Sequence, residues 1–159
     1  MTEKIVNIML KHNKEMLDLW QAKDEWQYKF FEQAMRKVAE DTNCDFSAEY
    51  QNNPCWIWNA GYYVKFTPKK LKSCKIWFGK YGRDKPYYFL AKDGISKSQN
   101  KLQCMTGKAS GSEPFGYNYI ADKYKNWDLN VACDIQNGEF GKYITDCINK
   151  ILNDPNFPK

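Results

Sequence analysis

At 159 residues with 43% apolar residues, the chain is long enough to form one domain and to bury a core without disulfide or metal staples. Its mean hydropathy of −0.76 is typical of a soluble globular protein, and no apolar run approaches the roughly 18 residues that a membrane span needs. The acidic and amide residues near the start differ from a secretory leader. We therefore expect a cytoplasmic protein that makes no membrane contact.

Positive charge is concentrated in the middle third of the chain. Residues 1–49 hold seven basic and ten acidic residues, residues 50–112 hold twelve and two, and residues 113–159 hold five and seven. One face that meets a polyanion would give this asymmetry, and so would a solvated, lysine-rich sheet edge that resists aggregation. Most of the basic residues are lysines, which bind phosphate as point charges but do not read guanine as arginine does. Nucleic-acid binding by these lysines would be largely indifferent to sequence.

The sequence offers little for catalysis or metal binding. No pair of its six cysteines has the CxxC spacing of a zinc site, and it has one histidine, His12. Buried, reduced thiols are favoured over disulfides because no leader is expected. The chain has no Ser-His-Asp pattern, nucleophile elbow or phosphate-binding loop. We expect no catalytic residue, no metal site and no cofactor, although a site made of distant carboxylates stays open.

The first 42 residues are predicted to be helical. Apolar residues recur at helical spacing from Ile5 to Val38, which indicates either one long helix or two helices that break near residues 21–24. His12 lies on this stripe, where a packed histidine is commoner than a ligand. A polar, irregular stretch is expected to follow as far as Pro54.

Three segments then alternate apolar and polar residues as strands do. In residues 60–67 and 74–80 the alternation divides the residues between one apolar face and one basic, aromatic face, and residues 86–92 form the third strand. The turn-prone residues 81–85 are expected to join the last two as a hairpin. These patterns predict a small antiparallel sheet.

The rest of the chain is expected to contain helices and an aromatic loop. Residues 96–106 are a helix candidate and residues 107–114 a loop. Residues 139–152 carry one apolar stripe, which is the strongest helical pattern in the chain. We thus expect a single α+β domain over residues 1–159, in which the last helix packs on the sheet. Its regions are helical (1–42), antiparallel sheet (60–92) and helices with the aromatic loop (95–153).

The order of strand, hairpin and loop, followed by PFGYNYI, YKNWD and NGEFGKYITDCINKIL, resembles the carboxy-terminal part of bacterial and phage proteins of the PD-(D/E)xK nuclease superfamily. The resemblance covers about residues 60–153. In that family an acidic residue and a D/E-x-K signature hold a metal ion. No acidic residue of this chain has a lysine two positions later. The resemblance therefore implies a related scaffold without the chemistry, and no catalytic residue is carried over.

Two sets of residues are candidates for binding. Cations interleaved with rings on the predicted sheet are typical of phosphate tracking with base stacking. The predicted nucleic-acid-binding residues are Lys65, Lys69, Lys70, Lys72, Lys75, Trp77, Lys80, Tyr81, Arg83 and Lys85. The predicted partner-binding rings are Phe115, Tyr117, Tyr119 and Trp127, which in an alternative interpretation pack the last helix onto the sheet.

The leading hypothesis is a non-enzymatic protein that binds nucleic acid, RNA more than DNA, or a nucleoprotein complex. A phage-type inhibitor or regulator of a nucleic-acid-processing complex, such as a CRISPR effector, would fit this hypothesis. The alternatives are a protein-interaction module or oligomer without nucleic-acid binding and, less favoured, a divergent metal-dependent nuclease. The sequence leaves the oligomeric state open.

Overall fold

The computed structural model describes residues 29–49, 57–58, 63–97 and 99–158. The predicted helical start before residue 29, with His12 and the choice between one helix and two, lies outside this part of the chain. The described elements are a helix at residues 29–41, the strands β1 (Cys44–Glu49), β2 (Tyr63–Pro68), β3 (Cys74–Gly79), β4 (Tyr87–Lys92) and β5 (Tyr117–Tyr119), a 3-10 turn (Asp122–Tyr124), and the helices α3 (Leu129–Gln136) and α4 (Glu139–Leu152).

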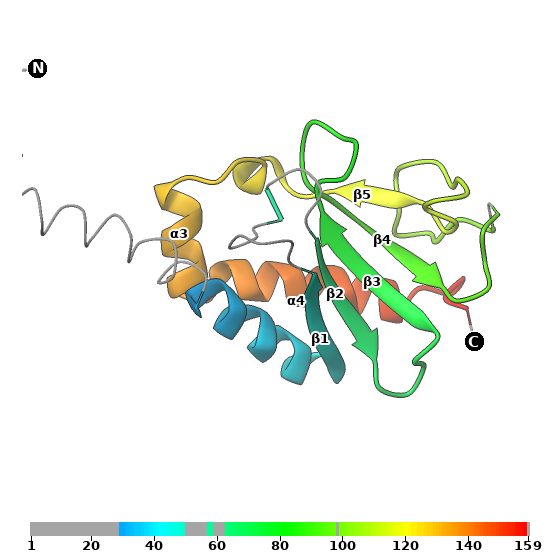
Figure 1. Cartoon of the computed structure of the whole chain (residues 1–159), viewed down its shortest axis with the longest axis horizontal. Coiled ribbons are helices and arrows are strands. Elements are labelled where there is room, and N and C mark those ends of the chain that lie inside the picture. Colours follow the sequence, from blue (N-terminus) through cyan, green and yellow to red (C-terminus); the bar gives the residue numbers. More distant parts are fainter. Residues whose placement is uncertain (1–28, 50–56, 59–62, 98, 159) are drawn as a thin grey trace, which may run out of the picture.

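The five strands form one antiparallel sheet in the order β1-β2-β3-β4-β5. The helix at residues 29–41 and α4 lie along one side of this sheet (Figure 1). The predicted α+β class, the antiparallel sheet with its hairpin and the packing of the last helix on the sheet are confirmed. Among the elements that the structure describes, no helix lies on the opposite side of the sheet (Figure 1).

Alternation along the strands separates the two faces of the sheet. In β2 and β3 the buried side chains include Val64, Phe66, Ile76 and Phe78, and the residues between them along each strand are of intermediate exposure. Side chains two positions apart on a strand share a face, so these four point to the helices. The intervening side chains, among them Trp77, point to the other face.

The helical layer closes the core through one apolar stripe and a group of rings. The predicted segment 139–152 is helix α4, and its residues Phe140, Ile144, Cys147, Ile148 and Ile151 are buried. The ring of Phe140 lies within 6.3 Å of the rings of Phe31, Trp58 and Tyr124, measured between centroids. These contacts join the helix at residues 29–41, α4 and the segment before α3 into one core.

The prediction of irregular structure after residue 42 is wrong for residues 44–49, which form β1. The segment CDFSAE alternates like the other strands, with Cys44 buried and with Phe46 and Ala48 packed against the core. The segment is only six residues long, and acidic residues and a serine separate its apolar positions, so the alternation was not recognised in the sequence. It pairs with β2 along its whole length and stands at one end of the strand order, which makes it an edge strand of the sheet.

The helix predicted at residues 96–106 is absent from the described residues of that segment. Its backbone N–H groups bond instead to distant parts of the chain: Gln99 to the carbonyl of Pro114, Leu102 to that of Phe115, and Cys104 to the Asp154 carboxylate. These tertiary bonds replace the local bonds that a helix would need. The predicted loop at residues 107–114 is confirmed.

No helix among the described residues is long and apolar enough to cross a membrane.

A ring-lined hollow on the outward sheet face

The outward face of the sheet is organised in two rows across the strands. The register pairs Tyr63 with Gly79 and Gly79 with Tyr87, which places two tyrosines on either side of a glycine. In the next row Lys65 pairs with Trp77 and Trp77 with Phe89. Since neighbouring strands lie about 4.8 Å apart, the backbones of the two tyrosines are separated by about 9.6 Å, with no side chain between them in their row.

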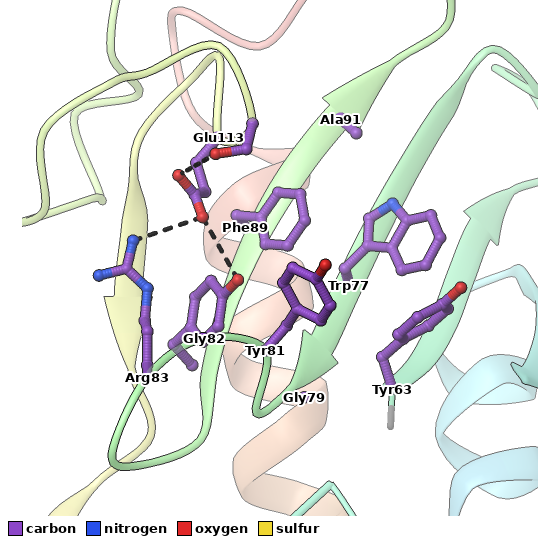
Figure 2. Close-up of a pocket in the computed structure, with 11 residues that line it drawn as sticks. Tyr63, Trp77, Gly79, Tyr81, Gly82, Arg83, Phe89, Ala91 and Glu113 are labelled. Atoms are coloured by element: carbon purple, nitrogen blue, oxygen red, sulfur yellow. Dashed lines mark hydrogen bonds and ion pairs between the residues drawn. The ribbon is translucent and has the colours of Figure 1, made fainter. Parts of the chain in front are cut away.

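This gap is part of a hollow of about 740 Å³, which Figure 2 shows with its lining residues. Five of its eleven lining residues are aromatic, and Gly79 and Ala91 contribute almost no side chain. Tyr81, from the connection between β3 and β4, is 71% exposed at its edge. The lining residues are Tyr63, Trp77, Gly79, Tyr81, Gly82, Arg83, Tyr87, Phe89, Ala91, Ser112 and Glu113.

The rings of the hollow support one another. Trp77 and Phe89 are parallel within 4°, with centroids 6.2 Å apart, and Phe89 is nearly parallel to Tyr87 at 5.7 Å. Tyr63 meets Trp77 edge-on at 4.3 Å, and the Nζ of Lys65 lies 5.2 Å from the centroid of the Trp77 ring. A packed set of rings with a cation beside it is preorganised for stacking against another flat ring.

An arginine and a buried glutamate form one wall of the hollow. The guanidinium carbon of Arg83 lies 3.8 Å from the ring centroid of Tyr117 and 4.6 Å from that of Tyr87. Its Nη2 also lies 3.3 Å from Oε1 of Glu113, whose side chain is only 8% exposed. This ion pair ties the connection between β3 and β4 to the loop at residues 107–114, so Arg83 has a structural role besides its charge.

The two oxygens of the Glu113 carboxylate differ in the lengths of their hydrogen bonds. Its Oε2 accepts short hydrogen bonds from the hydroxyls of Ser110 at 2.6 Å and Ser112 at 2.9 Å, while Oε1 has only the longer contacts to Arg83 and to the Tyr87 hydroxyl, both at 3.3 Å. Burial raises the pKa of this carboxyl, but the bonds from the two serines and Arg83 outweigh burial and hold it below its ordinary value. Glu113 is therefore an ionised acceptor at neutral pH.

The indole nitrogen of Trp77 is unusual in this protein. Among the side chains that the structure describes, it is the one buried nitrogen or oxygen atom without a hydrogen-bond partner. Such an unpaired donor costs roughly 1–3 kcal/mol, and native proteins keep few of them. Stability alone therefore does not explain an indole at this position.

The predicted cations divide into groups at opposite ends of the sheet. Lys69, Lys70 and Lys72 are exposed on the β2–β3 turn, whereas Lys80, Arg83 and Lys85 lie at the β3–β4 connection beside the hollow. Lys65 is between these ends, with Trp77. Three of the cations form ion pairs that reduce their free charge: Lys75 with Asp93, Arg83 with Glu113, and Lys85 with Asp122 at 3.4 Å.

The predicted partner-binding rings also separate. Phe115 is 5% exposed and belongs to the core, and Trp127 packs against Trp58 with centroids 5.2 Å apart. Tyr117 lies under Arg83, and Tyr119 is 37% exposed on β5. The two tyrosines extend the aromatic face toward the edge of the sheet, while Phe115 and Trp127 hold the following segment against the core.

Eight of the lining residues were not among the predicted site residues: Tyr63, Gly79, Gly82, Tyr87, Phe89, Ala91, Ser112 and Glu113. The strand alternation could have placed Phe89 and Gly79 on the face of Trp77, because both lie at even spacing from outward residues. No local pattern pointed to Glu113, which reaches the hollow only through the fold of the loop at residues 107–114.

The described residues contain no group of three histidine, cysteine or acidic side chains that could hold a metal ion. Three of the cysteines, Cys44, Cys74 and Cys147, are buried, and burial raises the pKa of each of these thiols. Comparison with known proteins finds no matching family model, no matching curated protein and no matching solved structure. The resemblance to the nuclease superfamily stays a prediction.

Proposed function

We propose that this protein binds single-stranded nucleic acid, RNA more than DNA, on the outward face of its sheet and performs no chemistry on it. The observation that carries the proposal is the ring-lined hollow, because it lies within the one strongly basic third of the chain. Rings stack on bases of any sequence, and nearby cations follow the phosphates. Phosphate attraction selects a nucleic acid over an uncharged flat ligand.

The shape of the face favours single strands over duplexes. Bases in a duplex are stacked on one another and do not offer their flat sides to protein rings, whereas unpaired bases do. The phenol groups of Tyr63 and Tyr81 line the hollow and can bond a ribose 2′-hydroxyl, which is the group that distinguishes RNA from DNA. A role as regulator of a nucleic-acid-processing complex would use the same face.

Fluorescence anisotropy with labelled single-stranded RNA, single-stranded DNA and duplex, at several salt concentrations, tests this proposal. Changing Phe89 to Leu keeps the site apolar but removes a stacking ring, so we expect the Kd for single strands to rise by about 5- to 150-fold. If wild-type protein binds no nucleic acid at low salt, the proposal fails and a protein partner for exposed Tyr81 and Tyr119 becomes the better explanation.

The contribution of the turn lysines can be separated from that of the rings. Replacing Lys69, Lys70 and Lys72 by Gln should reduce the slope of log affinity against log salt by about 0.7 for each lysine that contacts a phosphate. The matched control replaces three exposed lysines of the helical layer, Lys37, Lys142 and Lys150, with the same change in net charge. This control should leave the slope nearly unchanged, and an equal loss in both variants would mean that only net charge matters.

A further inference from the structure

The hollow combines flat apolar walls with one ionised acceptor, and this combination limits what fits inside it. Tyr63, Trp77 and Phe89 offer stacking surfaces, and the carboxylate of Glu113 lies in the wall. In Figure 2 a dashed line joins one oxygen of this carboxylate to Arg83. The same oxygen, Oε1, accepts a hydrogen bond from the hydroxyl of Tyr87 at 3.3 Å. Both contacts are longer than normal hydrogen bonds, so Oε1 keeps capacity to accept another donor.

The four bases differ in what they can offer to such an oxygen. Adenine, cytosine and guanine each carry an exocyclic amino group that donates hydrogen bonds. Uracil and thymine carry a single ring N–H between two carbonyl oxygens, and these oxygens repel a carboxylate. An ionised Glu therefore favours a base with an amino group and disfavours uracil, in the same way that Glu and Asp accept from the amino group of cytosine in DNA recognition.

We propose that the ring-lined hollow is a subsite for one unpaired base with an exocyclic amino group, and that Oε1 of Glu113 accepts a hydrogen bond from that group. The inference rests on the proposed function, since the base belongs to a bound single strand. It adds a base preference at one position to binding that the lysines make otherwise indifferent to sequence. Arg83, Ser110 and Ser112 act as positioning residues that hold the carboxylate in place.

The test uses oligouridine of about 12 nucleotides and versions in which one central uridine is replaced by cytidine or adenosine. Wild-type protein should bind the substituted strands roughly tenfold more tightly than oligouridine, as expected for a hydrogen bond to a charged group. In Glu113→Gln this ratio should fall close to one. Glu113→Asp retains the negative charge, but its side chain is shorter by one methylene and its carboxylate lies farther from the base. The ratio should therefore also fall in this variant.

Glu139→Gln is the matched control, because it makes the same chemical change on an exposed residue at the start of α4. Its ratio should stay at the wild-type value. Thermal melting confirms that each variant is folded, and the base ratio separates recognition from a general loss of affinity when the loop loosens.

The outcomes distinguish the two proposals. If wild-type protein binds every strand equally, or if Glu113→Gln keeps the preference, the base subsite is refuted while single-strand binding stands. If wild-type protein binds none of the strands, both proposals are refuted.

Discussion

A side chain added at Gly79, which lines the hollow, should weaken nucleic-acid binding without lowering the stability of the fold. Gly79 lines the hollow between Tyr63 and Tyr87, in the regular strand β3, so a side chain at this position points toward the space that a base would occupy. In Gly79→Val the added carbon atoms should displace one stacked base. Stacking contributes about 1–3 kcal/mol per base, so the Kd for a single strand should rise by roughly 5- to 150-fold.

Gly79 is itself buried, but it lines the hollow, so a side chain added there should extend into the hollow and should not weaken the fold. Glycine inside a strand costs about 0.5–1 kcal/mol relative to alanine, and valine is favoured in strands. We therefore expect the free energy of unfolding, measured by urea denaturation, to stay level or rise by up to about 1 kcal/mol. Stable Gly79→Val protein that binds as tightly as wild type would refute the hollow as the binding site, and a large loss of stability would refute the inference that a side chain at position 79 extends into the hollow.

Three further predictions concern the fold. Gly141→Ala should raise the free energy of unfolding by about 0.5–1 kcal/mol in urea denaturation and leave binding unchanged, because the added Cβ on α4 would lie 3.6 Å from Cγ2 of Val38, an ordinary contact; a loss of stability would contradict this packing. Phe140→Ala should lower the same free energy by about 3–5 kcal/mol, since its ring is fully buried, and a cost under 1 kcal/mol would contradict the ring core. Burial raises the pKa of the Asp154 carboxyl, but backbone N–H donors, including those of Cys104 and Asn156, outweigh burial and lower it. Because folding lowers this pKa, the ionised Asp154 should stabilise the fold fully above the unfolded pKa of about 3.9, and this stabilisation should be lost as pH falls through the folded pKa. Urea denaturation at a series of pH values should therefore show that Asp154→Asn loses less stability in acid than wild type does.

The sequence predicted those elements whose periodicity is uninterrupted. Residues 139–152 repeat apolar positions without a break, and helix α4 has the same bounds. The alternation in residues 74–80 placed Ile76 and Trp77 on opposite faces, as β3 has them. Local patterns succeeded here because burial on one side of each element decides its structure.

Where local patterns failed, distant contacts decide the structure. Residues 96–106 have the composition of a helix, but their N–H groups bond to the segment at 114–115 and to Asp154, more than ten positions away. The hollow is likewise a product of register, because Gly79 opens it only when it is paired between Tyr63 and Tyr87. Charge patterning indicated the basic third of the chain, but it could not separate the turn lysines from the cations beside the hollow.

The central claim is that single strands bind on the outward sheet face, and mapping of amide chemical shifts by NMR tests it most directly. Titration with single-stranded RNA should shift the amides of β2, β3 and β4 around Trp77 and Phe89 and the indole N–H of Trp77, and leave those of α4 in place. Shifts confined to the β2–β3 turn at residues 69–73 would mean that charge alone attracts the strand. Shifts on the helical layer without change at Trp77 would contradict the account.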